Sequence, residues 1–202
     1  MFALAVSLTG AVLFPRTLGA TVEEQRARLP PAADCPDPIE GVWLAHKYEE
    51  RMGEWYIYTL KVKRAAEGSS ELKGEIESHF WNGGPKDAQP PPCTDGMFRY
   101  IVHMPAKGAY VDESIQFGGL SWKADRPLCP SSRGMGYNPD NFTGKIDKKT
   151  QEFQSVNNDG GRAVNSPTVF RRVRCMEKPP PPGVKGTPPP FEPPRRLFGC
   201  GK

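Results

Sequence analysis

The chain lacks the residue patterns of several large protein classes. Its apolar run at residues 2–14 is shorter than the ~20 residues that a membrane-spanning helix needs. None of its five cysteines forms a Cys-x-x-Cys pair or lies at zinc-finger spacing from one of the three histidines. We therefore expect no metal, no cofactor and no stable insertion into a membrane.

The part of the chain that can fold also has little excess of basic over acidic residues. The whole chain carries a formal net charge of +4, of which residues 177–202, with five basic and two acidic residues, supply +3 (5 − 2 = 3). A nucleic-acid module concentrates its basic residues on the folded surface. The sequence therefore predicts no nucleic-acid partner.

Signatures of hydrolytic chemistry are missing or incomplete. The chain contains no Gly-x-Ser-x-Gly motif, so no serine is marked as a nucleophile. Glu75 and Glu77 share one face of a predicted strand and could act as a carboxylate pair, but an exposed strand is the simpler explanation. A secreted hydrolase stays open as an alternative, with no catalytic residue assigned.

Turn residues, by contrast, are abundant, and they are distributed unevenly. Glycine and proline together supply 44 residues (21 + 23), a composition that favours many short strands over long helices. Nine prolines lie in residues 177–202, which we interpret as an extended tail that could dock a protein partner. Residues 21–34 form a polar linker with at most one helical turn.

The first twenty residues resemble an export signal. A short apolar run precedes a small-residue cleavage site at Leu18, Gly19 and Ala20, so we interpret residues 1–20 as a signal peptide. The alternative is a buried N-terminal strand or helix. The signal peptide predicts a secreted or periplasmic protein with disordered N- and C-terminal extensions around one domain, residues 35–176.

That domain alternates apolar and polar residues, which is the period of a strand with one face on a core. Tyr56, Tyr58, Leu60 and Val62 share one face of residues 55–63. The same alternation recurs at residues 42–46, 72–80, 98–104, 114–122, 142–146, 152–156 and 168–174. The sequence therefore predicts an all-β fold, an antiparallel barrel or sandwich of about eight strands.

The cysteines fit an oxidising compartment, where two bridges and one leftover thiol are expected. Four cysteines allow three connectivities, and we favour Cys35–Cys175, which joins the ends of the domain, with Cys93–Cys129 between two internal loops. Cys200 would stay free or pair with a second chain.

Gly41, Val42 and Trp43 resemble the Gly-x-Trp opening of lipocalin-like (calycin) β-barrels. In that family the Trp closes one barrel end beside an Arg of the last strand, a place that Arg171 or Arg172 could take. We assign the barrel-closing pair to Trp43 and Arg171. The resemblance implies a barrel that holds a ligand.

Aromatic residues beside glycines are the candidate ligand contacts, because glycine lets a flat ligand approach the backbone. We single out Trp81, Trp122 and Tyr137, and add His103 as the histidine nearest a loop-lined mouth. The alternative is that these rings fill the core.

The sequence thus favours a non-catalytic β-barrel module that binds a small apolar ligand, or a glycan or protein surface. The alternative is a structural component of an envelope or secreted assembly, docked through its proline-rich tail.

Overall fold

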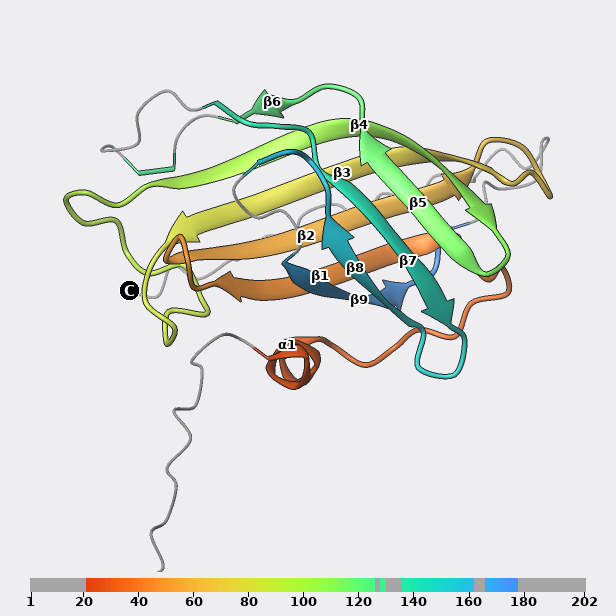
Figure 1. Ribbon diagram of the computed structural model, residues 1–202, viewed down its shortest axis with the longest axis horizontal. Coiled ribbons are helices and arrows are strands. Elements are labelled where there is room, and N and C mark those ends of the chain that lie inside the picture. Colours follow the sequence, from red (N-terminus) through yellow and green to blue (C-terminus); the bar gives the residue numbers. More distant parts are fainter. Residues whose placement is uncertain (1–20, 126–127, 130–135, 162–165, 178–202) are drawn as a thin grey trace, which may run out of the picture.

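The computed structural model describes residues 21–125, 128–129, 136–161 and 166–177 (Figure 1). The predicted signal peptide at residues 1–20 and the predicted tail beyond residue 177 lie outside the described residues. The elements within them are α1 (Val22–Arg28), β1 (Gly41–Glu49), β2 (Glu54–Arg64), β3 (Glu71–Asn82), β4 (Arg99–Val111), β5 (Ser114–Gly119), β6 (Lys123–Ala124), β7 (Asn141–Asp147), β8 (Glu152–Asn157) and β9 (Pro167–Arg174).

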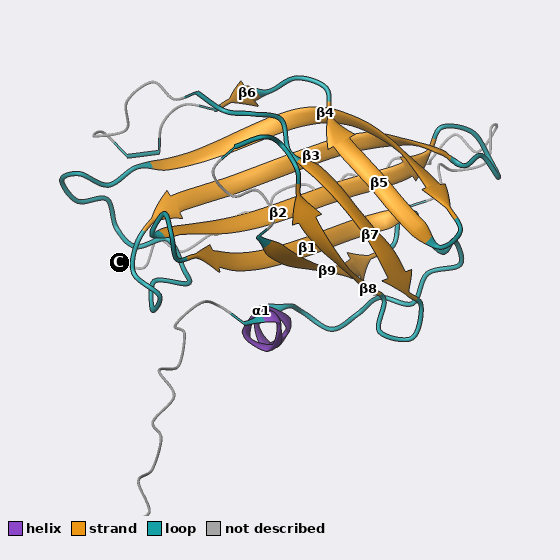
Figure 2. Ribbon diagram, in the orientation of Figure 1, coloured by secondary structure: helices purple, strands orange, loops and turns teal. Residues whose placement is uncertain are grey.

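Eight of these strands form a closed antiparallel barrel, which confirms the all-β prediction and resolves it in favour of a barrel (Figure 2). Each strand pairs with the next along the chain from β1 to β5 and from β7 to β9; β5 pairs with β7, and β9 returns to β1. The short β6 pairs with Val102 and His103 of β4, beside the end of β5. Because of this closure, each of the eight described barrel strands has a partner on both sides, and none is a sheet edge along its whole length.

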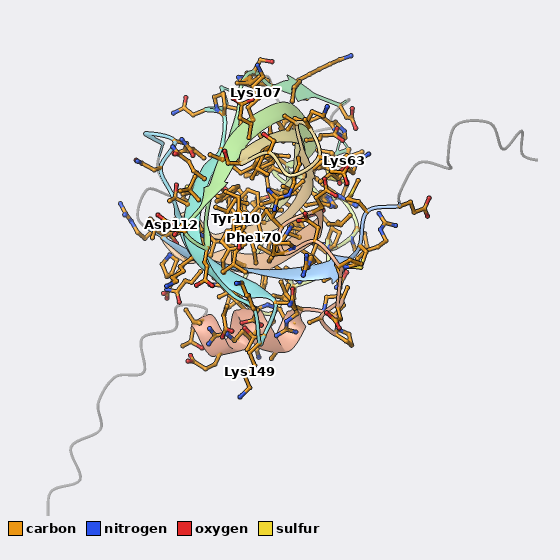
Figure 3. All side chains as sticks on the ribbon, turned by 90° about the vertical axis from the view of Figure 1, so that its right-hand side faces the viewer. Lys63, Lys107, Tyr110, Asp112, Lys149 and Phe170 are labelled. Atoms are coloured by element: carbon orange, nitrogen blue, oxygen red, sulfur yellow. A yellow bond between two sulfur atoms is a disulfide. The ribbon has the colours of Figure 1, made fainter. Side chains whose placement is uncertain are left out.

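The interior is filled by the residues that alternation places on one face of each strand. The predicted inward face of β2 is buried, as are the matching positions of β3 and β4. The largest wholly buried apolar side chains inside the barrel are Trp43, Tyr58, Phe117, Phe142, Phe153 and Phe170. In Figure 3, which looks from the side of the tight turns, side chains occupy the barrel and Phe170 lies among them.

Two glycines let neighbouring strands approach closely. A Cβ on Gly74 would lie 1.8 Å from the carbonyl oxygen of Lys61, and one on Gly108 would lie 1.9 Å from that of Gln116. Gly74 also has φ +156°, which side-chain-bearing residues rarely adopt. The strands coil through these positions only because no side chain is present, a recurrent means of curving a sheet into a barrel.

The barrel has two unlike ends. At one, which we call the closed end, short turns at residues 65–70, 112–113 and 148–151 connect the strands, and residues 29–40 cross it before β1. At the other, the loop end, the connections at residues 83–98, 120–140 and 158–166 are longer. Long connections on a rigid scaffold are where binding residues concentrate.

The segment expected as a polar linker contains α1, which lies against the outside of the barrel (Figure 1). Thr21 accepts a hydrogen bond from the backbone N–H of Glu24, whose carboxylate accepts one from the backbone N–H of Thr21, so a capping box begins the helix. Leu29, which precedes Pro30, is extended, as the proline ring requires, and ends it. α1 contacts β9 and β1.

Both predicted disulfides are present. Cys35–Cys175, the terminal bridge, joins residues 140 apart in sequence, and Cys93–Cys129, the loop bridge, joins residues 36 apart. The terminal bridge ties the segment before β1 to the end of β9. The loop bridge joins the 83–98 and 120–140 connections at the loop end.

Candidate functional site

The closed end is sealed by a buried Trp–Arg pair. The Trp43 indole is wholly buried and donates a hydrogen bond from Nε1 to the carbonyl oxygen of Ile39 at 2.9 Å. The guanidinium carbon of Arg172 lies 5.4 Å from the ring centroid, a cation–π contact. Arg172 also donates to the carbonyl oxygens of Asp37 and Glu40, so it fastens the crossing segment onto the barrel.

The assignment of Arg171 to this role was wrong. Its guanidinium points away from the interior, donates to Glu152 at 2.8 Å from Nε, and bonds the carbonyl oxygens of Leu29 and Pro30 at 3.0 Å. Phe170 and Arg172 share the inward face of β9, and Arg171 lies on the other face. Arg171 therefore holds the end of α1, and Arg172 closes the barrel.

The loop end differs because its interior carries polar and charged side chains. Lys47 and Glu49 continue the inward face of β1 beyond Trp43 and Ala45, and both are buried. Asp140, directly before β7, and Asn157, at the end of β8, are each at most 2% exposed. This end of the barrel is therefore lined by groups that can hydrogen-bond, whereas the closed end is packed with apolar rings.

Asp140 is the centre of one hydrogen-bonded group. Its Oδ2 accepts a hydrogen bond from the Tyr137 hydroxyl at 2.5 Å, and its Oδ1 accepts one from Nδ2 of Asn157 at 2.7 Å. Burial raises the pKa of the Asp140 carboxyl to about 7, since the charged form loses its water, although these two donors partly offset the effect. Near neutral pH this carboxyl can therefore both donate and accept a hydrogen bond.

Lys47 is the centre of a second group. Its Nζ donates to Oγ of Ser166 at 2.8 Å and to Oγ1 of Thr168 at 3.4 Å, and lies 3.4 Å from Oε2 of Glu49. Burial lowers the pKa of the Lys47 ammonium, and the negative charge of Glu49 opposes that shift. The ion pair thus lies inside the barrel wall and is shielded from solvent.

Aromatic rings continue from this polar interior to the surface. The Tyr137 ring stacks on Phe80 at 5.7 Å between centroids, and Phe80 stacks on Tyr100 at the same distance. Trp122 lies 6.2 Å from Tyr137 and is 38% exposed. Leu120, close by in the sequence, is 59% exposed. Two of the predicted ligand contacts, Trp122 and Tyr137, therefore lie together at the loop end.

Trp81 is not part of this arrangement. It lies on the outer face of β3, stacked on Trp55 of β2 at 6.4 Å, and it is wholly buried. Its Nε1 donates to the carbonyl oxygen of Asp87, and that of Trp55 donates to the carbonyl oxygen of Gly84. The 83–98 connection thus folds back over both indoles and forms a small outer core.

His103 is also outside the barrel. Its Nδ1 lies 3.2 Å from Glu75, its Nε2 lies 3.1 Å from Asp125, and Glu77 is 3.8 Å away. Burial lowers the pKa of His103, but the bond to Asp125 and the other carboxylates outweigh this effect and raise it above its usual value. Its contacts are carboxylates, not a hydroxyl that it could activate as a nucleophile.

The contacts described for the other two histidines include no hydroxyl or thiol that the ring could activate as a nucleophile either. His79 is bonded by Arg99, and burial together with that positive charge lowers its pKa to about 4. His46 is buried beside Trp55, with ring centroids 5.2 Å apart. The described contacts of the three histidines therefore give no support to a hydrolase.

The sequence interpretation missed Lys47, Glu49, Asp140 and Asn157. For two of these residues the signal was present: Trp43 and Ala45 point inward, so the period of two also places Lys47 and Glu49 inside. Asp140 precedes the inward-facing Phe142 by two residues, but lies in a connection without any periodic pattern. Nothing in the sequence links it to Tyr137 or Asn157.

Neither a metal centre nor a membrane helix can be identified in the part of the chain described. The described residues contain no group of three or more His, Cys, Asp or Glu side chains that could hold a metal ion. No helix among them combines the length and apolarity that crossing a membrane would take. Comparisons of this chain with known protein families, with curated proteins and with solved structures find no match.

Proposed function

We propose that this protein is a non-catalytic binding module that holds a small ligand at the loop end of its barrel. The proposal rests on one observation: the buried Asp140 and Asn157 are hydrogen-bonded to each other, and Asp140 is also bonded to the half-buried Tyr137, whose ring lies beside the exposed Trp122. Ligand sites are mostly apolar with a few convergent polar groups, and barrel mouths are a frequent place for them.

The ligand that suits this end is a small molecule with a flat apolar part and at least one hydrogen-bonding group. The flat part would lie against Trp122 and Tyr137, where stacking on an aromatic ring is favourable. The polar group would meet Asp140, whose carboxyl, with its pKa of about 7, can donate or accept. A wholly apolar ligand deep in the barrel is less suited, because rings such as Phe142 and Phe170 fill that space.

This binding mode agrees with the lipocalin resemblance of Gly41, Val42 and Trp43, which implies a ligand-holding barrel. We also propose that the protein is secreted or periplasmic. Two disulfides support this, since they persist in oxidising compartments. Cleavage after Ala20 would leave Thr21 first, and the capping box of α1 uses no residue before it.

Native mass spectrometry of the protein exported by its own host tests the proposal. We expect a stoichiometric extra mass that is released on denaturation. A sugar in place of a flat apolar molecule would instead favour glycan recognition. A bare monomer from every growth condition contradicts the proposal, and a covalent dimer would favour the assembly alternative through Cys200.

Three variants locate the site. Trp122→Ala and Asp140→Asn should each lower the retained ligand at least tenfold, since the first removes the exposed ring and the second the carboxyl. Val111→Ala is the matched control, because Val111 is 55% exposed but is the last residue of β4, at the closed end of the barrel. Equal retention in all three variants would place the ligand elsewhere.

A further inference from the structure

The barrel is not hydrogen-bonded along its whole circumference. β1 and β9 pair only where Val42, Trp43 and Leu44 meet residues 171–174, with a register shift after Val42. Leu44 lies opposite Arg171, so two residues further along each strand the same register would place His46 opposite Val169. No such pair exists among the described residues, so the β1–β9 ladder ends before it reaches the loop end. We call this stretch, in which the two strands form no backbone pairs, the seam.

Side chains of α1 occupy the seam. The amide N–H of Val169 donates to Oε1 of Gln25 at 3.0 Å, and Nε2 of Gln25 donates to the carbonyl oxygen of Pro167 at 3.0 Å. On the other strand, the carbonyl oxygen of His46 accepts a hydrogen bond from Nε of Arg28 at 3.4 Å. The backbone groups that would bond each other across a regular ladder are thus bonded to the helix.

The burial and the hydrogen-bonding groups of Gln25 suit this position. It is 1% exposed, although glutamine is usually a surface residue, and its carboxamide offers one donor and one acceptor to the β9 backbone as a neighbouring strand would. Around it, Arg26 pairs with Glu152 at 2.8 Å. α1 therefore lies over the seam through specific polar contacts of Gln25, Arg26 and Arg28.

The inner side of the seam opens on the polar interior. Lys47, next to His46 on β1, extends its side chain across the seam to Ser166, directly before β9, and to Thr168 in β9. The Lys47 ammonium also lies 3.4 Å from the carboxylate of the buried Glu49, at the loop end of β1. α1 thus covers the outer side of the seam, and the Lys47 side chain lies on its inner side.

We propose that α1 is a latch: its release from the seam opens a lateral entrance to the loop-end interior, through which ligand enters and leaves. This inference rests on the proposed function for the identity of what passes, but not for the opening itself. The terminal bridge holds Cys35, six residues after Leu29, so α1 can leave the seam while its segment stays attached to the barrel.

Chemical labelling of Lys47 tests the latch without any ligand. The protein, with both disulfides intact, is treated briefly with acetic anhydride, and the acetylation rate of each lysine is read by peptide mass spectrometry. In the wild type, Lys47 should react far more slowly than the exposed Lys107, because its amine is buried.

Gln25→Ala removes both bonds to β9. The loss of two hydrogen bonds corresponds to an increase of about thirtyfold in the open population, and the Lys47 rate should rise by at least tenfold. Hydrogen exchange at the Val169 amide should accelerate in parallel. Glu23→Ala, at an exposed position on the same helix, is the control and should change neither rate.

An unchanged Lys47 rate in Gln25→Ala overturns the proposal, since the seam would then be closed by something other than α1. An increase at Lys47 together with equal increases at buried amides far from the seam, such as that of Phe142 in β7, also overturns it, because global loosening would be the cause. Native mass spectrometry answers separately whether a ligand is bound, so failure of the latch and failure of the proposed function are distinguishable.

Discussion

Asp140→Asn isolates the contribution of one buried carboxyl to the free energy of unfolding. Asparagine has nearly the same shape, and its Oδ1 can keep the bond from Asn157 while its amide faces the Tyr137 hydroxyl, which can rotate to accept. The substitution therefore removes the titrating proton and little else. Any difference that depends on pH between the two proteins reports on Asp140.

The direction in which stability changes with pH follows from the pKa of Asp140 in the folded and in the unfolded chain. In the folded protein the pKa of Asp140 is about 7, above its ordinary 3.8, so between these pH values the folded state keeps a proton that the unfolded chain has lost. The stability that this proton contributes is fully present below pH 3.8 and is lost as the pH rises to 7. The difference of about 3 units corresponds to about 4 kcal/mol.

Urea denaturation from pH 4 to pH 8 measures the effect. At pH 4 the two proteins should have free energies of unfolding within about 1 kcal/mol of each other, and by pH 8 the variant should be more stable by about 4 kcal/mol. Groups that titrate in both proteins cancel in the difference. Asp112→Asn is the control, because Asp112 is exposed and its positive φ of 49° suits asparagine.

A difference curve that stays flat over this range refutes the reasoning, since Asp140 would then be charged at all these pH values. A variant that is less stable at pH 8 refutes it as well, because the carboxylate would then be worth more than its desolvation costs.

Three further changes test the architecture, each by urea denaturation at one pH. Gly74→Ala should destabilise the protein by at least about 3 kcal/mol, because the added Cβ would lie 1.8 Å from a carbonyl oxygen. Gly136→Ala is its control: a Cβ there would meet no atom within 4 Å, so the free energy of unfolding should change by less than about 0.5 kcal/mol. Arg172→Ala should cost about 3–5 kcal/mol and alter Trp fluorescence, and Arg171→Ala should cost less; the reverse order would return the barrel-closing role to Arg171. Replacing both cysteines of the terminal bridge by alanine should cost up to about 5 kcal/mol, against about 4 for the loop bridge, and a larger loss for the loop bridge would contradict the chain-entropy argument.

The fold could be predicted because the barrel's strands alternate over most of their length. Tyr56, Tyr58, Leu60 and Val62 of β2 each point inward, as the period of two requires, and the same pattern in β3 and β4 locates the core. The disulfides could be paired because the terminal bridge joins the two ends of the domain. These features depend on local pattern or on the position of the ends, both of which a single sequence contains.

The closing arginine could not be chosen from the sequence because β9 is covered on both faces. Val169 points out of the barrel and is wholly buried, while Phe170 points inward and is equally buried. Because two adjacent residues are both apolar, alternation does not show which of them points inward, and it therefore cannot distinguish Arg171 from Arg172. The cover on the outer side is α1, which the polar composition of residues 21–34 does not reveal.

Trp81 illustrates the same limit on β3. Its neighbours on the outer face, Glu75, Glu77 and His79, indicate a face in water, and most of that strand agrees. Only the return of the 83–98 connection, with its carbonyl oxygens bonded to the indoles of Trp55 and Trp81, makes this end of the face a buried one. Such a contact depends on tertiary folding and does not show in the alternation of apolar and polar residues along the sequence.

The loop-end interior is where the barrel departs most from what stability alone would favour. A buried ion pair such as Lys47–Glu49 is often no better than apolar side chains of equal volume, because desolvation opposes the attraction. A carboxyl whose pKa is raised to about 7 is likewise held where its charge is unfavourable. The closed end shows that this chain can fill a barrel with aromatic rings, so polar groups at the other end are not forced by the fold. Local rules are broken most often where a protein binds or reacts, and here the break coincides with the longest connections and with the seam beneath α1.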